Sequence, residues 1–299
     1  MIKFILIIIF LYCLFCYPEF RYCVFHPFTS VPHALHDILK YIKYKRWNEM
    51  KTYGCMDVYI ADERQPFGSG KTLNMIRNAF AIYNQFNDTS VYNFVSGEWV
   101  KQYVHVFSNI ELRGIPYVPL VNTYQLIQVA TEEQKDYDIH IYVFVIDELG
   151  RIFNNRDWKT NLNSDLLGAI LQQRKNHLVI LGTVQDYSLF DATLRKLCTN
   201  VYSCTKHWRL LTLRHFYAKD LERANFNIDL VRLRGLYVRF ATDLLYNSYD
   251  TREVVADLQK EITAGQHLSN EEVLKLSENN NDTRTLTRVA KRFRKHVRG

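Results

Sequence analysis

The stretch VYIADERQPFGSGKTLNMI, residues 58–76, decides the fold of this 299-residue chain. It opens with a short apolar strand, Val58-Tyr59-Ile60-Ala61, and reaches a glycine-rich turn at Gly68-Ser69-Gly70. From Lys71 the apolar residues recur at the spacing of a helix. Glycines let backbone N–H groups turn toward anionic oxygens, and a helix N-terminus adds positive potential. The stretch therefore predicts a phosphate-binding loop.

The residues of this turn have defined roles if it binds ATP. Lys71 would reach the β- and γ-phosphates, and the Thr72 hydroxyl would bind Mg²⁺. Gln65 stands where such loops usually have their first glycine. A chance Gly-Ser-Gly turn before a helix is the alternative, but the Lys-Thr pair and the strand-to-helix context favour the phosphate loop. The predicted nucleotide-binding residues are Gly68, Ser69, Gly70, Lys71 and Thr72.

A second strand ends in two carboxylates. All six residues from Ile141 to Ile146 are apolar or aromatic, as in a strand that is buried on both faces of a parallel sheet. Asp147 and Glu148 follow at the carboxyl end, where such sheets bind ligands. We expect Asp147 to hold Mg²⁺ and Glu148 to act as general base for the attacking water. An ordinary acidic turn is the alternative.

A third strand, Leu178 to Thr183, is followed by Gln185. A polar side chain there can bond the γ-phosphate or the water, and a loop glutamine is the alternative. Arg174 precedes the strand and could reach a neighbouring subunit's nucleotide as an arginine finger. Arg151 and Arg195 compete for that role, and for each arginine a solvated surface position is the alternative.

These motifs resemble a known family. The resemblance covers roughly residues 55–205 and points to the zonular occludens toxin-like ATPases of filamentous phages, and more broadly to the FtsK/HerA group of DNA-pumping ATPases. Four elements occur in order: Gly68 to Thr72; Val106 to Leu112 with Gly114 to Tyr117; Val145 to Glu148 with Arg151 and Phe153; and Gln173 to Lys175 leading to Gly182 to Gln185.

The resemblance implies a ring-forming motor that moves DNA or exports a phage genome with ATP. It implies Lys71, Thr72, Asp147, Glu148 and Gln185 as site positions, with Arg174 a further match. The phage proteins often carry their membrane span after the ATPase domain, whereas the apolar segment here lies at the N-terminus.

The net charge of +7 comes from one end of the chain. Residues 284–299, Arg284 to Arg298 with the final glycine, contain seven Lys or Arg and no acid. Without those seven, the chain balances its 31 acidic residues with as many basic ones. Such a tail can bind a DNA backbone or anionic lipid, and a solubilising end is the alternative.

The N-terminus is strongly apolar. Residues Phe4 to Tyr17 form a run that spans about 21 Å as a helix, against a bilayer core of about 30 Å. No small-residue cleavage site follows, so we expect an uncleaved anchor that residues beyond Pro18 extend. The basic residues between Lys40 and Arg46 favour a cytoplasmic C-terminal side. The alternatives are an interfacial helix and a wrongly assigned start codon.

We predict an α/β fold of the P-loop NTPase type. Its mainly parallel sheet is flanked by helices, antiparallel strands at 201–206 and 210–218 are added at the edge, and an apolar anchor helix precedes it. The predicted parts are a membrane anchor or signal-like segment (1–24), a linking helix (33–50), the ATPase domain (52–245), a helical region (246–278) and a polar linker with the basic tail (279–299).

The leading functional hypothesis is a membrane-associated, ATP-hydrolysing motor that moves DNA in phage assembly, packaging or export. The alternatives are a conjugation- or partition-type coupling ATPase, and a nucleotide-binding scaffold with weak turnover, which Gln65 favours. Expected partners are DNA, bound by the tail and the ring interior, the membrane, further copies of the chain, and phage assembly or coat proteins. The expected location is the host membrane, with the ATPase domain in the cytoplasm.

Overall fold

The computed structural model describes residues 2–49, 54–94, 96–120, 124–131, 140–149 and 164–249. The chain divides into two compact units, residues 1–49 with 90–100 and residues 50–89 with 101–299. The predicted ATPase domain, 52–245, overlaps mainly with the second unit, whereas its residues 90–100 group with the N-terminal unit. The physical reason is aromatic packing, since Tyr44 contacts the rings of Tyr92 and Phe94.

The described residues form a sheet of nine strands in the order β2-β3-β5-β6-β1-β7-β8-β9, with β4 paired to β3. Parallel pairing runs from β3 through β5, β6 and β1 to β7, and antiparallel pairing follows at β8 and β9. The strands are β1 Cys55–Ala61, β2 Thr89–Asn93, β3 Glu98–Ser108, β4 Val118–Pro119, β5 His140–Ile146, β6 Leu178–Val184, β7 Asn200–His207, β8 Leu210–Tyr217 and β9 Gly235–Phe240.

The predicted antiparallel addition is confirmed, but its position is corrected. β7 is not an edge strand, because it pairs parallel to β1 on one side and antiparallel to β8 on the other. The change of direction therefore lies between β7 and β8, which a two-residue turn at Trp208 and Arg209 connects. β7 ends at the same edge of the sheet as β1, so it reaches the phosphate loop.

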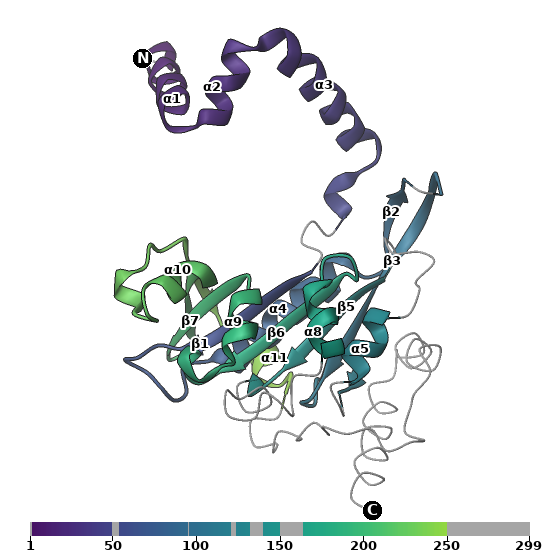
Figure 1. The fold of residues 1–299 in the computed structure, drawn as a ribbon, viewed down its shortest axis with the longest axis vertical. Helices are drawn as coiled ribbons and strands as arrows, with labels where there is room; N and C mark the ends of the chain where they lie inside the picture. The colour runs from purple at the N-terminus through teal and green to yellow at the C-terminus, as the bar shows by residue number, and fades with distance from the viewer. Residues whose placement is uncertain are drawn as a thin grey trace, which may run out of the picture. The chain divides into compact units, whose positions relative to one another are not determined.

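Helices cover both faces of the sheet (Figure 1). One face packs against α4 (Lys71–Phe86) and α11 (Asp243–Tyr246), and the other against α5 (Tyr124–Thr131), α8 (Ser164–Leu171), α9 (Ala192–Leu197) and α10 (Ala218–Arg223). The side chains of β5 explain why both faces of the sheet are covered. Ile141, Val143 and Val145 belong to the hydrophobic core on the α4 side of the sheet. Tyr142, Phe144 and Ile146 belong to the core on the opposite side. This confirms the prediction of a strand that is buried on both faces.

The N-terminal unit contains three helices, α1 (Ile2–Cys16), α2 (Pro18–Phe25) and α3 (Pro27–Lys43), followed by the 3₁₀ turn η1 (Arg46–Asn48). The apolar segment is therefore not one helix, because Pro18 opens α2 and cannot continue the hydrogen bonding of α1. Among the described residues no single helix has the length and apolar character of a membrane span, although Lys3–Cys16 and Pro18–Phe25 meet the requirement together, with a bend of 106°.

The linking helix predicted at 33–50 has different bounds in the structure. α3 begins at Pro27, whose ring suits the first turn of a helix, and ends at Lys43. Lys45 then takes a left-handed conformation with φ 46°, which separates α3 from the 3₁₀ turn that contains Trp47. The predicted helical region at 246–278 lies outside the described residues after Tyr249, as does the predicted linker and tail at 279–299.

One acidic group is buried in the middle of the sheet. Asp57 on β1 is 6% exposed, and its carboxylate accepts a hydrogen bond from the Asn200 amide at 2.8 Å. Burial raises the pKa of Asp57 to about 6, although the bond from Asn200 opposes the shift. An unfolded aspartate has a pKa of about 3.9. Folding therefore favours the protonated form of this side chain.

We predict that Asp57→Asn stabilises the protein at pH 7. Between pH 4 and 6 the wild-type Asp57 is protonated in the native state and ionised in the unfolded state. The free energy of unfolding therefore falls as the pH rises, and the stability that protonated Asp57 contributes at pH 4 is lost once the pH passes 6. The shift corresponds to about 2–3 kcal/mol. Urea denaturation at several pH values measures it, with the exposed Asp229→Asn as control. An unchanged slope between pH 4 and 6 would contradict the prediction.

Candidate functional site

The carboxyl ends of the parallel strands bring the predicted site residues to one edge of the sheet. In the register, Ile60 of β1 pairs with Val184 of β6, and Ile146 of β5 pairs with Gly182 of β6. The phosphate loop, the Gln185 segment and the Asp147-Glu148 turn leave these three strands side by side. The site is therefore assembled from three distant parts of the sequence, with β6 between the other two strands.

The loop has the geometry of an anion cradle. Gly70 caps the N-terminus of α4 with φ 79°, and Gly68 has φ 66°, both in the left-handed region that favours glycine. Among the described residues, the backbone N–H groups of Gly68, Ser69 and Gly70 donate no hydrogen bond. The Ser69 hydroxyl is buried without a partner in the same part of the chain. These unused donors at a helix N-terminus suit phosphate oxygens.

The Lys71 side chain lies at the centre of the site. Its Nζ donates a hydrogen bond of 2.9 Å to Oε1 of Gln185. Burial lowers the pKa of Lys71, while the neighbouring Asp147 and Glu148 carboxylates counteract that shift. The structure thus joins the phosphate-loop lysine to the glutamine that the sequence placed in the same site.

The Asp147 carboxylate, just after β5, connects to α4 and to β6. Its Oδ1 accepts one hydrogen bond from the Thr72 hydroxyl at 3.0 Å and another from the Thr183 hydroxyl at 2.6 Å. Burial raises the pKa of Asp147, and the two hydroxyl bonds oppose the shift by favouring the ionised form. Thr72 and Asp147, the two predicted Mg²⁺ ligands, are therefore in direct contact.

Two positioning residues were missed by sequence reasoning. The buried Asn109 side chain, just beyond β3, pairs with the backbone of Asp147 twice: its Nδ2 donates to the carbonyl at 2.9 Å, and its Oδ1 accepts from the N–H at 2.8 Å. Thr183 accepts from the backbone N–H of Glu148 at 2.9 Å. Both residues are polar and lie at the end of a core strand, a signal that could have identified them.

The Asp147-Glu148 turn is held in a restricted conformation. Glu148 has φ 57°, which is uncommon for a residue with a long side chain and occurs at functional sites. The next residue, Leu149, packs directly over Gly182, where a Cβ atom would lie 2.5 Å from the leucine Cδ2. The absence of a side chain at Gly182 therefore lets Leu149 anchor the turn that carries the predicted general base.

Gln65 braces the start of the loop. Its side-chain amide pairs with the backbone of Lys206 near the end of β7, donating from Nε2 at 3.0 Å and accepting at Oε1 at 2.9 Å. Its own N–H bonds the carbonyl of Asp62 at 2.9 Å. The buried Asp62 in turn accepts hydrogen bonds from Ser203 and Arg214. The residue that departs from the usual glycine thus fixes the loop to a neighbouring strand.

The structure does not bring Arg174 into this constellation. Arg174 is exposed in the turn before β6, and its backbone lies against Gly54, just before β1. Arg174 therefore lies at the amino end of β6 and Gln185 at its carboxyl end. The seven residues of the strand separate the two by about 23 Å. A role in its own subunit's site is excluded by this distance, and a role in a second subunit stays a prediction. Arg151 lies outside the described residues.

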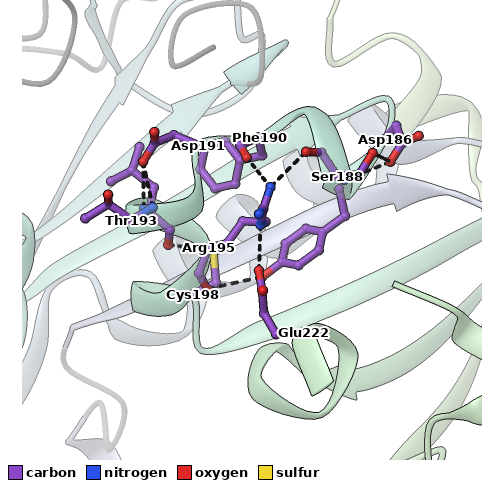
Figure 2. Close-up of polar contacts among 10 residues, drawn as sticks. Asp186, Ser188, Phe190, Asp191, Thr193, Arg195, Cys198 and Glu222 are labelled. Carbon is purple, nitrogen blue, oxygen red and sulfur yellow. Dashed lines mark hydrogen bonds and ion pairs between the residues drawn. The ribbon is translucent and has the colours of Figure 1, made fainter. Parts of the chain in front are cut away.

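Arg195 on α9 has a different role from the one considered for it (Figure 2). Its side chain is 8% exposed and donates to the carbonyls of Ser188 and Phe190 at 2.8 and 2.5 Å and to the Glu222 carboxylate at 2.5 Å. Its guanidinium also lies 4.7 Å from the ring centre of Phe226. These contacts hold the buried guanidinium inside its own chain through Nε and Nη1, so the structure gives Arg195 a structural role in place of the finger role.

The Arg195 network holds the segment that follows Gln185. Asp186 accepts from the N–H and the hydroxyl of Ser188, at 2.8 and 2.7 Å, and closes the turn η2 (Tyr187–Leu189). Arg195 then ties that turn to α10 through Glu222. A cleft of about 360 Å³ opens beside it. Pro66 and Phe67 of the phosphate loop line this cleft, with the segment after Gln185 on one side and α10 on another. The network therefore fixes the segment after Gln185 relative to α10.

The residues present fit a nucleotide with Mg²⁺. The cradle offers unused N–H donors, the buried Lys71 supplies a positive charge, and a threonine hydroxyl and a carboxylate provide the hard oxygen ligands that Mg²⁺ prefers. Glu148 stands next to this group at a backbone-fixed position. The arrangement suits binding of a phosphate chain and attack on its end by water.

We predict that Thr183→Val loosens the acidic turn. Valine has nearly the same shape, but it removes the donor to Asp147 and leaves the N–H of Glu148 without its acceptor, which costs about 1–3 kcal/mol of the free energy of unfolding. Urea denaturation measures this loss. Thr183→Ser keeps the hydroxyl and is the matched control, and a serine variant as unstable as the valine variant would contradict the argument.

Several solved structures are similar to part of this chain. A solved structure of the N-terminal domain of zonular occludens toxin from Neisseria meningitidis shares 15% identity, over 66% of this chain and 100% of that one, with a TM-score of 0.43. The genome packaging NTPase B204 of Sulfolobus turreted icosahedral virus 2, in complex with ATP-gammaS, shares 10% identity over 63% of this chain and 98% of that one, with a TM-score of 0.35. No curated protein matches the chain.

The family assignment comes from the sequence profile of a known family. The profile of Zonular occludens toxin (Zot) matches residues 65–253, which is more than half of the chain and includes the acidic turn and the Gln185 segment. The chain belongs to the zonular occludens toxin (Zot) family.

Proposed function

We propose that this protein is a membrane-associated ATPase that uses ATP hydrolysis to move DNA during phage assembly, packaging or export. The observation that carries the proposal is the contact of the phosphate loop with both other motifs, Lys71 with Gln185 and Thr72 with Asp147. Membership of the Zot family supports it.

The proposal gives each residue a role that the geometry supports. The N–H groups of the cradle and the Lys71 ammonium would hold the phosphates of ATP. The bond from Lys71 to Gln185 would open when the γ-phosphate enters between them, so Gln185 would sense the terminal phosphate. Glu148, whose backbone Thr183 fixes, would take a proton from the attacking water.

Thr72 and Asp147 would hold Mg²⁺. When bound, the ion would neutralise negative charge on the phosphate oxygens of ATP while the terminal phosphoryl group passes to water. Asn109 and Thr183 would keep the Asp147 carboxylate aimed at the Thr72 hydroxyl, because both bond to Asp147 from neighbouring strands.

The DNA, membrane and subunit contacts extend this proposal beyond the site. The basic tail at 284–299 would bind the DNA backbone, and a ring of subunits would place further contacts in its interior. The apolar N-terminal segment would anchor the protein in the host membrane, with the ATPase unit in the cytoplasm. Arg174 would serve a neighbouring subunit's nucleotide, and phage assembly or coat proteins would be the other partners.

We predict that Lys71→Ala abolishes ATP hydrolysis, because it removes the cation at the phosphate chain. Glu148→Gln should lower the hydrolysis rate by about 10²–10⁴-fold while ATP stays bound, because glutamine cannot accept the proton. Phosphate release with no DNA, single-stranded DNA and double-stranded DNA measures the rate, and filter binding measures retained ATP.

The exposed Lys175→Ala, at the opposite edge of the sheet, is the matched control for loss of a lysine. Wild-type protein that hydrolyses ATP no faster with either DNA would contradict the motor. Wild-type protein that binds ATP and turns it over poorly under every condition would instead favour the nucleotide-binding scaffold.

We predict that deletion of residues 284–299 weakens DNA binding and reduces its dependence on salt. For each phosphate of duplex DNA that the protein no longer neutralises, the slope of log affinity against log salt should fall by about 0.9. Replacement of the seven basic residues by glutamine should reproduce the deletion at full length. Unchanged affinity and slope in both variants would contradict a DNA-binding role for the tail.

A further inference from the structure

Helix α3 carries a complete apolar stripe that faces solvent. Its apolar residues recur at spacings of three and four, and all six are between 50% and 94% exposed. Burying such side chains is worth roughly 1.5–3 kcal/mol each, so a stripe of this length marks a contact surface. The stripe consists of Phe28, Val31, Leu35, Ile38, Leu39 and Ile42.

An aromatic cluster lies at the C-terminal end of α3, in the same compact unit. The ring centre of Tyr44 lies 4.2 Å from that of Tyr92 and 5.2 Å from that of Phe94. The ring centres of Tyr92 and Trp99 are 5.6 Å apart. The cluster joins the end of α3 to the tip of the β2–β3 hairpin. Phe94 and Trp99 stay 48% and 46% exposed, so the cluster has an apolar body and an open side. Tyrosine and tryptophan in this state are typical of the membrane–water boundary.

Basic residues lie beside the aromatic cluster, and one of them, Arg46, also pairs with Glu49 at 3.4 Å. Lys40, Lys43, Lys45 and Arg46 fall within seven residues. The Lys43 ammonium lies 5.1 Å from the ring centre of Tyr44, and the Arg46 guanidinium 5.0 Å from that of Phe94. Basic residues near a membrane surface contribute about 1 kcal/mol each with anionic lipid.

The same charges disfavour a parallel second copy of the chain as the partner of the stripe. The three-and-four spacing from Phe28 to Ile42 would suit a coiled coil. However, Asp37 is the only acid in α3, so two parallel copies would bring their basic ends together without compensating acids. An anionic surface meets both the apolar stripe and the basic end.

We propose that α3 and the aromatic cluster form a membrane-surface binding unit. α3 would lie along an anionic bilayer with its stripe in the boundary between headgroups and acyl chains, and the aromatic cluster and basic residues would sit at headgroup level. This contact deepens the membrane association of the proposed function and rests on that part of it, but it needs neither ATP hydrolysis nor a membrane span by α1.

The test uses the full-length chain and local fluorescent probes. The chain has four tryptophans. The double substitution Trp158→Phe with Trp208→Phe leaves two probes, Trp47 just after α3 and Trp99 in the aromatic cluster. Detergent is removed in the presence of vesicles of phosphatidylcholine, with or without phosphatidylglycerol. Bromine-labelled lipids should quench both tryptophans in the anionic vesicles, and acrylamide in the water should quench them less than in lipid-free protein.

The matched variants place the same charge on opposite faces of α3. Leu35→Glu with Ile38→Glu acidifies the stripe, and His33→Glu with His36→Glu acidifies the other face. The residues on the stripe are exposed, so the substitutions disturb no core. We expect the first variant to need at least about tenfold more lipid for half-maximal quenching, and the second to change much less. Glutamine at the four basic positions should remove the preference for phosphatidylglycerol.

Three outcomes would overturn the proposal. Protein that floats with the vesicles while Trp47 and Trp99 stay unquenched would show that α1 alone binds lipid. Equal effects of the two charge variants would show that the stripe is not in contact with the bilayer. Unquenched tryptophans together with concentration-dependent association that only Leu35→Glu with Ile38→Glu abolishes would identify a second copy as the partner.

Discussion

The Asp147 carboxylate is the group on which the site depends. One of its oxygens accepts hydrogen bonds from Thr72 of α4 and Thr183 of β6, while Asn109 holds its backbone from the end of β3. A buried carboxylate without such donors would be costly, and the two hydroxyls supply them. The same bonds set the distance between the phosphate loop and the acidic turn. The order of the parallel strands makes this possible, because β6 lies between β1 and β5 and brings Thr183 between the other two groups.

The departure from the usual loop sequence has a structural explanation. A glycine at position 65 would supply conformational freedom, whereas Gln65 supplies two hydrogen bonds to the backbone of Lys206. The beginning of the loop is thereby fixed to β7, and the buried Asp62 adds contacts to Ser203 and Arg214. The glycines that remain, Gly68 and Gly70, keep the left-handed conformations needed where the backbone turns around the phosphates. Rigidity at the start of the loop and freedom at its end are therefore supplied by different residues.

The two compact units show different surface chemistry. The unit with the sheet buries its apolar residues in two cores on either side of the strands. The N-terminal unit leaves the apolar stripe of α3 exposed and gathers aromatic and basic residues at its end. Under the proposals made above, the first unit would perform the chemistry and the second would keep it at a membrane surface. Residues 90–100, which include most of β2 and the beginning of β3, group with the N-terminal unit although both strands pair within the sheet.

The sequence by itself determined the α/β class, the phosphate loop, the buried strand ending in Asp147 and Glu148, and the position of Gln185, because each depends on local pattern: glycine spacing, a run of apolar residues, a polar residue at a strand end. Only the tertiary structure decided which side chains meet. Thr183 and Asn109 gain their roles from strands distant in sequence, Arg195 is occupied by its buried partners, and Arg174 lies at the far edge of the sheet. Strand order and register fix these contacts, and neither can be read from local spacing.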